Sequence, residues 1–371
     1  MQIGTRIMAK FYSDFFDVDQ NYFPQINDSS ILQGEKDDPD FWMRTYPHKT
    51  FVEMLAKFED VLSRKNKRTL WVEGAYGSGK SQCAYTMRRL LEVSEDKVNE
   101  YWERYEPLKK RDDIRLKFLG HKKNKQIVTA FRYGSGDVFG SRQFFSMIQD
   151  TLLTEFKRLG ITDIGSETWR QAAIAWLSDD TNKQVFNLYL PKYSNAFSQK
   201  SADEVLKDLE KGGDISVLMT NLMNVGETQG IEVFSFNDDR FLDWIREVFN
   251  ENPDLCIVFV WDEFGDFFTN NPNCLTSFQR MIELVAEIPF YFIGVTHEIR
   301  QILDRAGANK NQLKVLDRIV PCDIVLPDNT AFELIGAATT IKPATKKQWE
   351  KFSDGLNDRV TESRKKISQF A

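Results

Sequence analysis

One short run of the chain limits its fold more than any other feature, because residues 74–81 follow the pattern G-x-x-x-x-G-K-[ST]. The apolar residues 69–72 before the run predict a strand, and residues 82–93 after it predict a helix. A strand that passes through a glycine-rich turn directly into a helix is typical of a parallel sheet with helices packed on it. We therefore expect an α/β protein built around such a sheet.

The same run predicts a phosphate-binding loop. Glycines let successive backbone N–H groups turn inward around an anion, and the helix start adds its unpaired N–H groups and its dipole. Lys80 would reach the β- and γ-phosphates of a nucleotide, and Ser81 would bind Mg²⁺. The residues expected to hold the nucleotide are Gly74, Ala75, Tyr76, Gly77, Ser78, Gly79, Lys80, Ser81 and Gln82.

A second group of candidate residues follows another predicted strand. The continuous apolar run 255–261 leads directly into Asp262 and Glu263, which is the Walker B pattern. Carboxylates at the end of a buried parallel strand lie at the edge of the sheet where ligands bind. Asp262 would complete the Mg²⁺ shell, and Glu263 would act as general base on the attacking water. Asp266, three residues later, is expected to begin a helix rather than to bind a ligand.

The rest of the chain alternates between strand and helix patterns. Further strands are expected at 126–133, 288–296 and 323–326, joined by helices through right-handed crossovers. Residues 162–252 show helical patterns without a convincing strand, and we expect their core to contain Trp169, Trp176 and Trp244. The expected parts are an irregular N-terminal arm at 1–45, a core at 46–140 and 253–340, a helical insertion at 141–252, and the start of a helical lid or a linker at 341–371.

The composition narrows the class of partner. The chain has 371 residues and a net charge of −6, which argues against a basic nucleic-acid-binding face across the whole protein. Residues 109–125 form the best local basic patch, but acidic neighbours dilute it, so a solvated helical face is expected there. DNA therefore stays open as a partner.

The cysteines, the histidines and the hydropathy pattern indicate a cytoplasmic location. The four cysteines are scattered and predict buried thiols in a reducing compartment. The three histidines do not cluster with them, so no zinc site is expected. The N-terminus lacks the apolar segment of a signal peptide, and no apolar run approaches the length of a membrane span.

With these two motifs, the chain resembles the additional-strand P-loop ATPases over residues 51–334. The resemblance is to the AAA+ superfamily and to its relatives among the origin-recognition and signal-transducing (STAND) ATPases. It implies ATP and Mg²⁺ as ligands, ATP hydrolysis, and a homo-oligomer. It also implies about five strands in the order 5-1-4-3-2, numbered from the strand before the glycine-rich loop, with a large helical insertion between strand 2 and the Walker B strand.

The resemblance also implies two further catalytic residues. The strand after Walker B ends in a polar sensor that positions water, which matches Thr296, with His297 as the alternative. An arginine finger acts on the ATP of a neighbouring subunit from just before the fifth strand. Arg318 matches that position and Arg305 is the second candidate, while the ordinary alternative is a surface ion pair such as Arg318 with Asp317.

Two aromatic residues and one turn are weaker candidates. Tyr46 or His48 lies one helix before the loop, where the family often packs against adenine, although a lone aromatic there is more often part of a core. Residues 134–136, with two glycines, would turn the chain at the ligand edge of the sheet.

The chain departs from the family in two places. The insertion is longer than the single helix that the family needs, so it is either a partner-binding or gating element or a stabilising elaboration. Residues 331–340 fit the first helix of the family's lid, but little chain follows. We therefore expect the N-terminal ATPase part of a longer protein, since large antiviral ATPases of bacterial phage-exclusion loci look similar around 46–48 and 71–80.

Two functions follow from this reading. In the first, an Mg-dependent ATPase couples hydrolysis to conformational change or assembly that acts on DNA or a protein complex, in antiviral defence. In the second, a slow nucleotide-gated switch or scaffold signals to an effector domain or partner. A small-molecule kinase is disfavoured, because Glu263 beside Asp262 would activate water.

Overall fold

The computed structural model describes residues 11–18, 37–63, 67–134, 143–161, 169–211, 216–234, 238–271, 274–297, 317–325 and 330–367. The chain divides into two compact units. One consists of Met1–Gln25 with Leu326–Ala371, and the other of Ile26–Val325.

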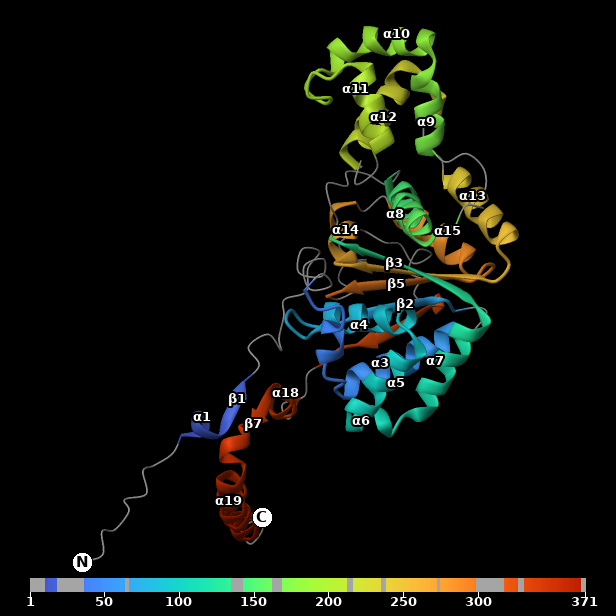
Figure 1. The fold of residues 1–371 in the computed structure, drawn as a ribbon. Helices are drawn as coiled ribbons and strands as arrows, with labels where there is room; N and C mark the ends of the chain where they lie inside the picture. Colours follow the sequence, from blue (N-terminus) through green and yellow to red (C-terminus); the bar gives the residue numbers. More distant parts are fainter. Residues whose placement is uncertain are drawn as a thin grey trace, which may run out of the picture. The chain divides into compact units, whose positions relative to one another are not determined.

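The larger unit is built around a five-stranded parallel sheet in the order β3-β4-β5-β2-β6 (Figure 1). Its strands are β2 (Thr69–Glu73), β3 (Gln126–Tyr133), β4 (Leu255–Asp262), β5 (Phe290–Thr296) and β6 (Ile319–Asp323). The expected α/β class, with a parallel sheet flanked by helices, is confirmed. The expected order 5-1-4-3-2 counts from the strand before the glycine-rich loop. In the structure the strand before that loop is β2, because β1 precedes it in the chain. The observed order in chain numbering, β3-β4-β5-β2-β6, therefore differs from the expected one.

Helices cover both faces of the sheet, which is why its central strands are apolar along their whole length. Consecutive residues of β4 point to opposite faces, with Ile257, Phe259 and Trp261 in one core and Val258 and Val260 in the other. The helices on the first face are α8 (Gln143–Leu159), α13 (Asp238–Glu251), α14 (Phe264–Asn270) and α15 (Leu275–Leu284). Those on the second are α3 (Lys49–Ser63), α4 (Lys80–Glu92), α5 (Glu95–Arg104), α6 (Glu106–Lys109) and α7 (Asp112–Asn124).

A helical bundle extends from the first face, drawn in green in Figure 1. It consists of α9 (Trp169–Ser178), α10 (Asp180–Tyr189), α11 (Ala202–Lys211) and α12 (Ser216–Gln229), with the 3-10 turns η2 (Leu190–Tyr193) and η3 (Glu232–Phe234). Trp169 and Trp176 pack in this bundle as expected, and the indole of Trp169 donates to the carbonyl of Phe234 at 3.1 Å. Trp244 lies on α13 and packs against Phe156 of α8, and it belongs to the same hydrophobic cluster as Trp169, against which Trp176 packs.

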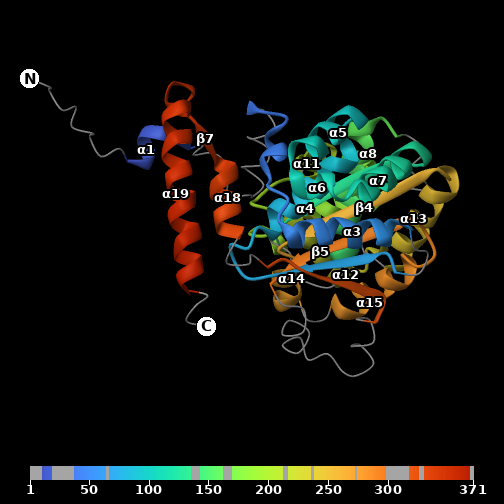
Figure 2. The same cartoon turned by 90° about the horizontal axis from the view of Figure 1, so that it is seen from below.

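The smaller unit joins the two ends of the described chain. Its elements are α1 (Tyr12–Phe15), β1 (Phe16–Val18), α18 (Thr330–Ala338), β7 (Thr339–Ile341), η6 (Pro343–Thr345) and the long α19 (Lys346–Ile367), the last drawn in red in Figure 2. Strand β1 pairs antiparallel with β7, and the rings of Phe15 and Phe16 contact Trp349 of α19. The expectation of an irregular arm is therefore wrong for residues 12–18.

One predicted strand lies at different bounds. The strand expected at 323–326 is β6 (Ile319–Asp323), which pairs with β2 so that Ile319 lies opposite Thr69. Its central Pro321 makes the strand hard to predict from the sequence. Proline has no N–H to donate, so within sheets it is confined to edge strands, strand starts and bulges. β6 is such an edge strand.

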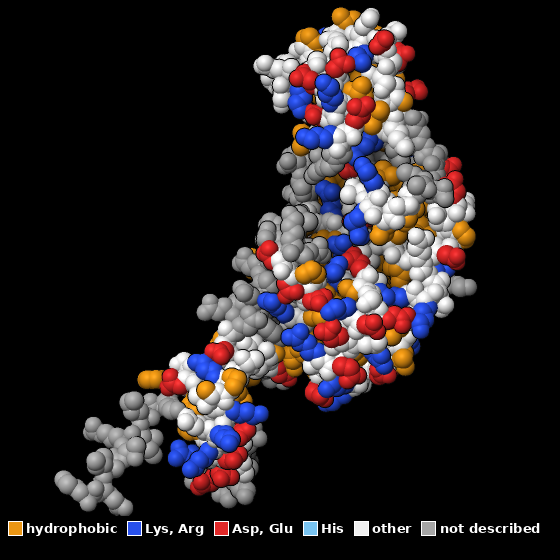
Figure 3. Space-filling model, viewed as in Figure 1, with side chains coloured by type: hydrophobic (Ala, Val, Ile, Leu, Met, Phe, Trp, Pro, Cys, Tyr) orange, Lys and Arg blue, Asp and Glu red, His pale blue; other side chains and the backbone are white. Residues whose placement is uncertain are grey.

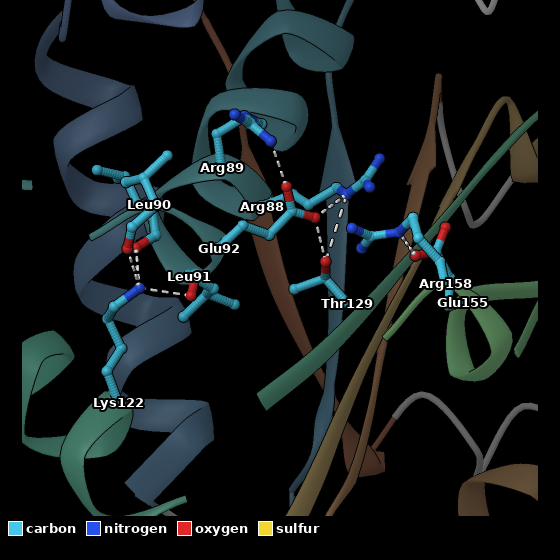
Figure 4. A network of polar contacts seen from close by, with 10 residues as sticks. Arg88, Arg89, Leu90, Leu91, Glu92, Lys122, Thr129, Glu155 and Arg158 are labelled. Carbon is cyan, nitrogen blue, oxygen red and sulfur yellow. Dashed lines mark hydrogen bonds and ion pairs between the residues drawn. The ribbon is translucent and has the colours of Figure 1, made fainter. Parts of the chain in front are cut away.

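The C-terminal end of α4 is held by a cation from α7 (Figure 4). The ammonium of Lys122 donates to the carbonyl oxygens of Leu90, Leu91 and Val93, at 3.2, 2.5 and 2.6 Å. These carbonyls belong to the last turn of a helix, where backbone acceptors lack partners and positive charge is favourable. The contact therefore fixes the end of α4 to α7.

Glu92, also at the end of α4, joins the helix to the sheet (Figure 4). Its carboxylate accepts from Arg88 at 2.5 Å and from Arg89 at 2.7 Å, and from the hydroxyl of Thr129 on β3. Hydrogen bonds and charge from the two arginines and Thr129 keep the pKa of Glu92 below its usual value despite burial, which alone would raise it. The network holds α4, whose first residue is Lys80, in place on the sheet.

Candidate functional site

The loop 74–79 connects β2 to α4 and depends on its glycines. Gly77 and Gly79 have φ values of +76° and +84°, a left-handed conformation that residues with a Cβ rarely adopt. A Cβ on Gly74 would lie 2.4 Å from the carbonyl oxygen of Ile324 and 2.8 Å from Oγ of Ser78. The loop therefore needs glycine for two reasons, a left-handed backbone at two positions and close backbone approach at a third.

Lys80 is the first residue of α4 and is only 5% exposed. Its Nζ donates to the carbonyl oxygen of Ala75, in the loop, at 3.0 Å. Burial lowers the pKa of Lys80, and the negative charges of Glu263 and Asp262 oppose that effect. The structure thus brings the predicted phosphate-binding cation close to the two predicted acidic residues.

Asp262 ends β4 and is fully buried. Burial raises the pKa of its carboxyl to about 6, although a hydrogen bond with the Ser81 side chain acts in the opposite direction. Its Oδ1 accepts from the backbone N–H of Glu263 at 2.9 Å. The two residues predicted to bind Mg²⁺, Ser81 and Asp262, therefore lie in contact.

Three buried side-chain oxygens at this edge have no hydrogen-bond partner within the described part of the chain: Oδ2 of Asp262, Oγ1 of Thr296 and Oγ of Ser78. Thr296 ends β5, where it lies opposite Glu73 at the start of the loop. A buried polar atom without a partner costs about 1–3 kcal/mol. A ligand that offers positive charge or hydrogen-bond partners would recover that cost, so these residues fit Mg²⁺ and a phosphate.

The donor set also agrees with the way Mg²⁺ binds to proteins. Across the described ranges, no group of three or more His, Cys, Asp or Glu side chains is arranged to hold a metal ion. Mg²⁺ does not need one, because it usually takes one or two carboxylates and completes its shell with phosphates and water. Asp262 and Ser81 would supply the protein's share.

Glu263 follows Asp262 in an unusual conformation. Its φ of +56° is left-handed, which costs a residue with a side chain about 1–3 kcal/mol, and such strained residues cluster at functional sites. Its Oε2 lies 3.7 Å from Nε2 of His297, and the ring of His297 stacks on that of Tyr76. The sequence gives no signal of these contacts, because they join residues that follow three different strands.

Gly134 also lies at this edge. With φ +70° it turns the chain after β3, as expected, and its N–H donates to the carbonyl of Asp262 at 2.9 Å. The indole of Trp261 donates to the carbonyl of Gly134 at 2.9 Å. The other residues of that predicted turn, 135 and 136, lie outside the described residues.

The arginine expected to act in trans is on the surface. Arg318 directly precedes β6, its side chain is 52% exposed, and its Nη1 lies 3.7 Å from Oε1 of Glu283 on α15. The ion pair considered as an alternative therefore forms, but with Glu283 rather than with Asp317. Arg305, the second candidate, lies outside the described residues.

Of the two aromatic candidates for stacking on adenine, His48 is buried and Tyr46 is half-buried at the edge of the core. His48 is 4% exposed, and its Nδ1 accepts from the backbone N–H of Phe51 at 3.3 Å at the start of α3. Burial lowers the pKa of His48 to about 4. Tyr46 packs edge-on against Tyr105. His48 is therefore a helix cap in the core rather than an open stacking surface.

The basic patch at 109–125 is neutralised by nearby acids. Arg111 pairs with Asp113 at 3.0 Å, and Arg115 pairs with Asp112 at 2.6 Å. In Figure 3, basic and acidic side chains are interspersed over the lower part of the larger unit. This face is a solvated helical surface, as expected.

The cysteines agree with the sequence prediction, since all four are free and buried. Within the described ranges, no helix combines the length and the apolar character that a membrane crossing requires. A scan against protein-family models finds none that matches the chain, and a search of curated proteins finds no match either. Function is therefore inferred from the arrangement of the side chains.

Proposed function

We propose that the chain is a P-loop ATPase of the AAA+ or STAND kind, which hydrolyses ATP with Mg²⁺. The observation that carries this proposal is the meeting of Lys80, Ser81 and Asp262 beside a glycine loop, with a buried carboxylate oxygen that lacks a partner. A bound Mg²⁺–triphosphate would explain why three such groups lie together at one edge of the sheet. These groups are a buried cation, a hydroxyl and an acid whose burial is unfavourable.

Each residue has a role in this proposal. The N–H groups of loop 74–79 and the ammonium of Lys80 bind the phosphates, and Ser81 with Asp262 holds Mg²⁺. Glu263 takes a proton from the attacking water, and the buried hydroxyl of Thr296 orients that water. When bound, Mg²⁺ neutralises and orients the phosphate oxygens.

We extend the proposal to an assembly in the cytoplasm in which Arg318 completes the site of a neighbouring copy. The bundle α9–α12 is the surface that we propose for a protein partner, since it extends from the layer over the sheet (Figure 1). The conformational change would act on DNA or a protein complex, and antiviral defence is the setting that the likeness around 46–48 and 71–80 favours.

The test compares two site variants with a surface control. We expect Lys80→Ala to weaken Mg·ATP binding by about tenfold or more, because the charge-assisted contact with phosphate is lost. Glu263→Gln should retain binding but lower turnover by about 10²–10⁴, the usual contribution of a general base. Calorimetry measures the binding and phosphate release measures the turnover.

Lys123→Ala is the matched control, since Lys123 is an exposed lysine whose ion pair with Glu95 spans 3.7 Å. A wild type that fails to bind Mg·ATP, or equal binding by Lys80→Ala, would show the proposal to be wrong. A nucleotide-gated switch predicts a different pattern, in which the wild type binds ATP with little turnover and Glu263→Gln changes nothing.

A further inference from the structure

Side chains that follow three strands meet beside the loop. Tyr76 comes from the loop after β2, Glu263 follows β4, and His297 follows β5. Nε2 of His297 lies 3.7 Å from Oε2 of Glu263. The rings of His297 and Tyr76 are stacked, with centroids 6.1 Å apart and planes inclined by 30°. His297 is thus the middle member of a row that runs from the loop to the proposed base.

The backbone of His297 is anchored to the same loop. Its carbonyl oxygen accepts from the N–H of Gly74, the first residue of the loop, at 3.3 Å. The imidazole is therefore placed by the loop twice, through the main chain at Gly74 and through the ring of Tyr76. A movement of the loop would carry the imidazole with it.

Glu263 has a fixed backbone but needs help to orient its carboxylate. Its N–H donates to Oδ1 of Asp262, and its φ of +56° turns it away from the direction of β4. These contacts fix the Cα but leave the side-chain torsions open. Lys80 acts on this carboxylate through its charge, while His297 approaches it with an imidazole that is charged only when protonated. At 3.7 Å the contact with His297 is longer than a hydrogen bond, as catalytic contacts often are before substrate binds.

We propose that His297 is a positioning residue for Glu263, holding the carboxylate where it meets the attacking water and linking its orientation to the loop that grips the phosphates. This inference rests on the proposed function. It assigns His297 a role different from that of a sensor, because the imidazole acts on the base rather than on the phosphate.

The kinetic test separates orientation from binding. We expect His297→Ala to lower kcat by about tenfold, since a mispositioned base costs rate, while KM for ATP changes by less than about twofold. Lys80, Ser81 and Asp262 remain in place, so binding should be retained. His297→Gln should restore most of kcat, because its amide N–H can reach the carboxylate from a similar position.

The control is a second histidine–glutamate pair. Nε2 of His121 lies 3.7 Å from Oε1 of Glu59 in the contact between α7 and α3. His121→Ala therefore removes a contact of equal length that the proposal does not use. Its kcat should match that of the wild type.

A second readout needs neither ATP nor turnover. The chain has three histidines, so their ring signals in a ¹⁵N-edited spectrum can be assigned by single substitutions. Glu263→Gln should shift the Nε2 signal of His297 and leave the signals of His48 and His121 unchanged. The same spectrum tests the contact even if His297→Ala does not fold.

The outcomes distinguish this inference from the proposed function. If the wild type hydrolyses ATP and Glu263→Gln does not, but His297→Ala keeps full kcat, the positioning role is wrong and the ATPase stands. A loss of ATP binding in His297→Ala would also overturn the positioning role. A wild type that neither binds nor hydrolyses ATP would overturn both.

Discussion

Asp262 is the residue at which stability and the proposed function conflict. A fully buried carboxyl with its pKa raised to about 6 is charged at neutral pH only at a cost. Such groups are concentrated at functional sites, where a ligand offsets the cost. The motif predicts this acid from the sequence, but the burial that makes it costly comes from the helices that cover β4.

We expect Asp262→Asn to stabilise the ligand-free protein at pH 7.5 by about 2 kcal/mol. The pKa of Asp262 rises from 3.8 to about 6, and each pKa unit corresponds to about 1.4 kcal/mol of stability that the charged wild type loses. Asparagine avoids this loss, but its buried amide lacks a hydrogen-bond partner, which offsets part of the stabilisation. The folded pKa lies above the unfolded value of 3.8, so the folded state binds more protons between pH 4 and 6. The wild type therefore loses stability relative to the variant as pH rises through this window. Urea unfolding at pH 4 and 7.5 measures the difference.

Asp266→Asn is the control, because Asp266 is an exposed carboxylate in the first turn of α14. Its stability should stay within about 0.5 kcal/mol of the wild type at both pH values. In Asp262→Asn, Mg·ATP should no longer raise the unfolding midpoint. A variant that is less stable than the wild type at pH 7.5 would contradict the cost that we assign to Asp262.

At the scale of elements, the helices that support the site are fixed at their ends. α4 begins with Lys80, and its last turn is held by Lys122 and Glu92 (Figure 4). α3 begins at Lys49, directly after His48, whose carbonyl accepts from Val52 and whose Nδ1 accepts from Phe51. Helical patterns in the sequence predict the central turns of α3 and α4. They do not predict the contacts that hold the helix ends, because these contacts join residues that are distant in sequence or depend on burial.

The cap of α3 predicts a pH dependence opposite to that of Asp262. Burial lowers the pKa of His48 from 6.5 to about 4, so the unfolded state binds more protons between these values. The wild type should therefore lose up to about 3 kcal/mol of stability as pH falls through this window, since protonation turns the acceptor at Nδ1 into a donor. His48→Asn keeps an oxygen acceptor at the cap and should lack this dependence.

The measurement is urea unfolding of the wild type and His48→Asn at pH 7 and pH 4.5. His121→Asn is the control, because the side chain of His121 is 26% exposed and its removal should leave the acid dependence of stability in place. Parallel pH curves for the wild type and His48→Asn would contradict the assignment of His48 as a neutral cap.

At the scale of the whole molecule, the proposed function needs an arginine that acts on the ATP of a neighbouring copy. Arg318 pairs with Glu283 at the surface, 3.7 Å apart, with about half of each side chain exposed. Exposed pairs of this kind contribute about 0–1 kcal/mol, so the pair leaves the arginine available to a second copy.

We therefore expect two inactive variants to restore each other. Lys80→Ala keeps its arginine but loses its site, and Arg318→Ala keeps its site but loses its arginine. An equimolar mixture should hydrolyse ATP about tenfold or more faster than either variant alone, because a finger contributes about 10³–10⁵ in rate. Phosphate release measures the effect, and it should grow with protein concentration.

Glu283→Gln is the matched control, since it breaks the same surface pair and leaves Arg318 intact. It should keep the turnover of the wild type. A mixture whose rate is only the sum of its two components would assign Arg318 no role in a neighbouring site.

Local patterns along the chain predict the class of the fold, most of the strands and the candidate ligand-binding residues. Residues 126–133 and 255–261 were predicted as strands because alternation and continuous apolar runs are local properties, and β3 and β4 follow them closely. Lys80, Ser81, Asp262 and Glu263 were found because each lies in a short motif next to such a strand. The bounds of β6 were hard to predict because it contains a proline. Its place in the sheet follows from its pairing with β2, which is distant in sequence.

Contacts between distant residues depend on how the folded segments pack together. The pairing of β1 with β7 joins residues 16–18 to 339–341, and no local pattern encodes it. The contact of His297 with Glu263, and the pair of Arg318 with Glu283, depend on how separate strands and helices are packed. The physical reason is that a motif specifies chemistry along the chain, whereas burial, unpartnered oxygens and shifted pKa values arise only when distant segments exclude water together.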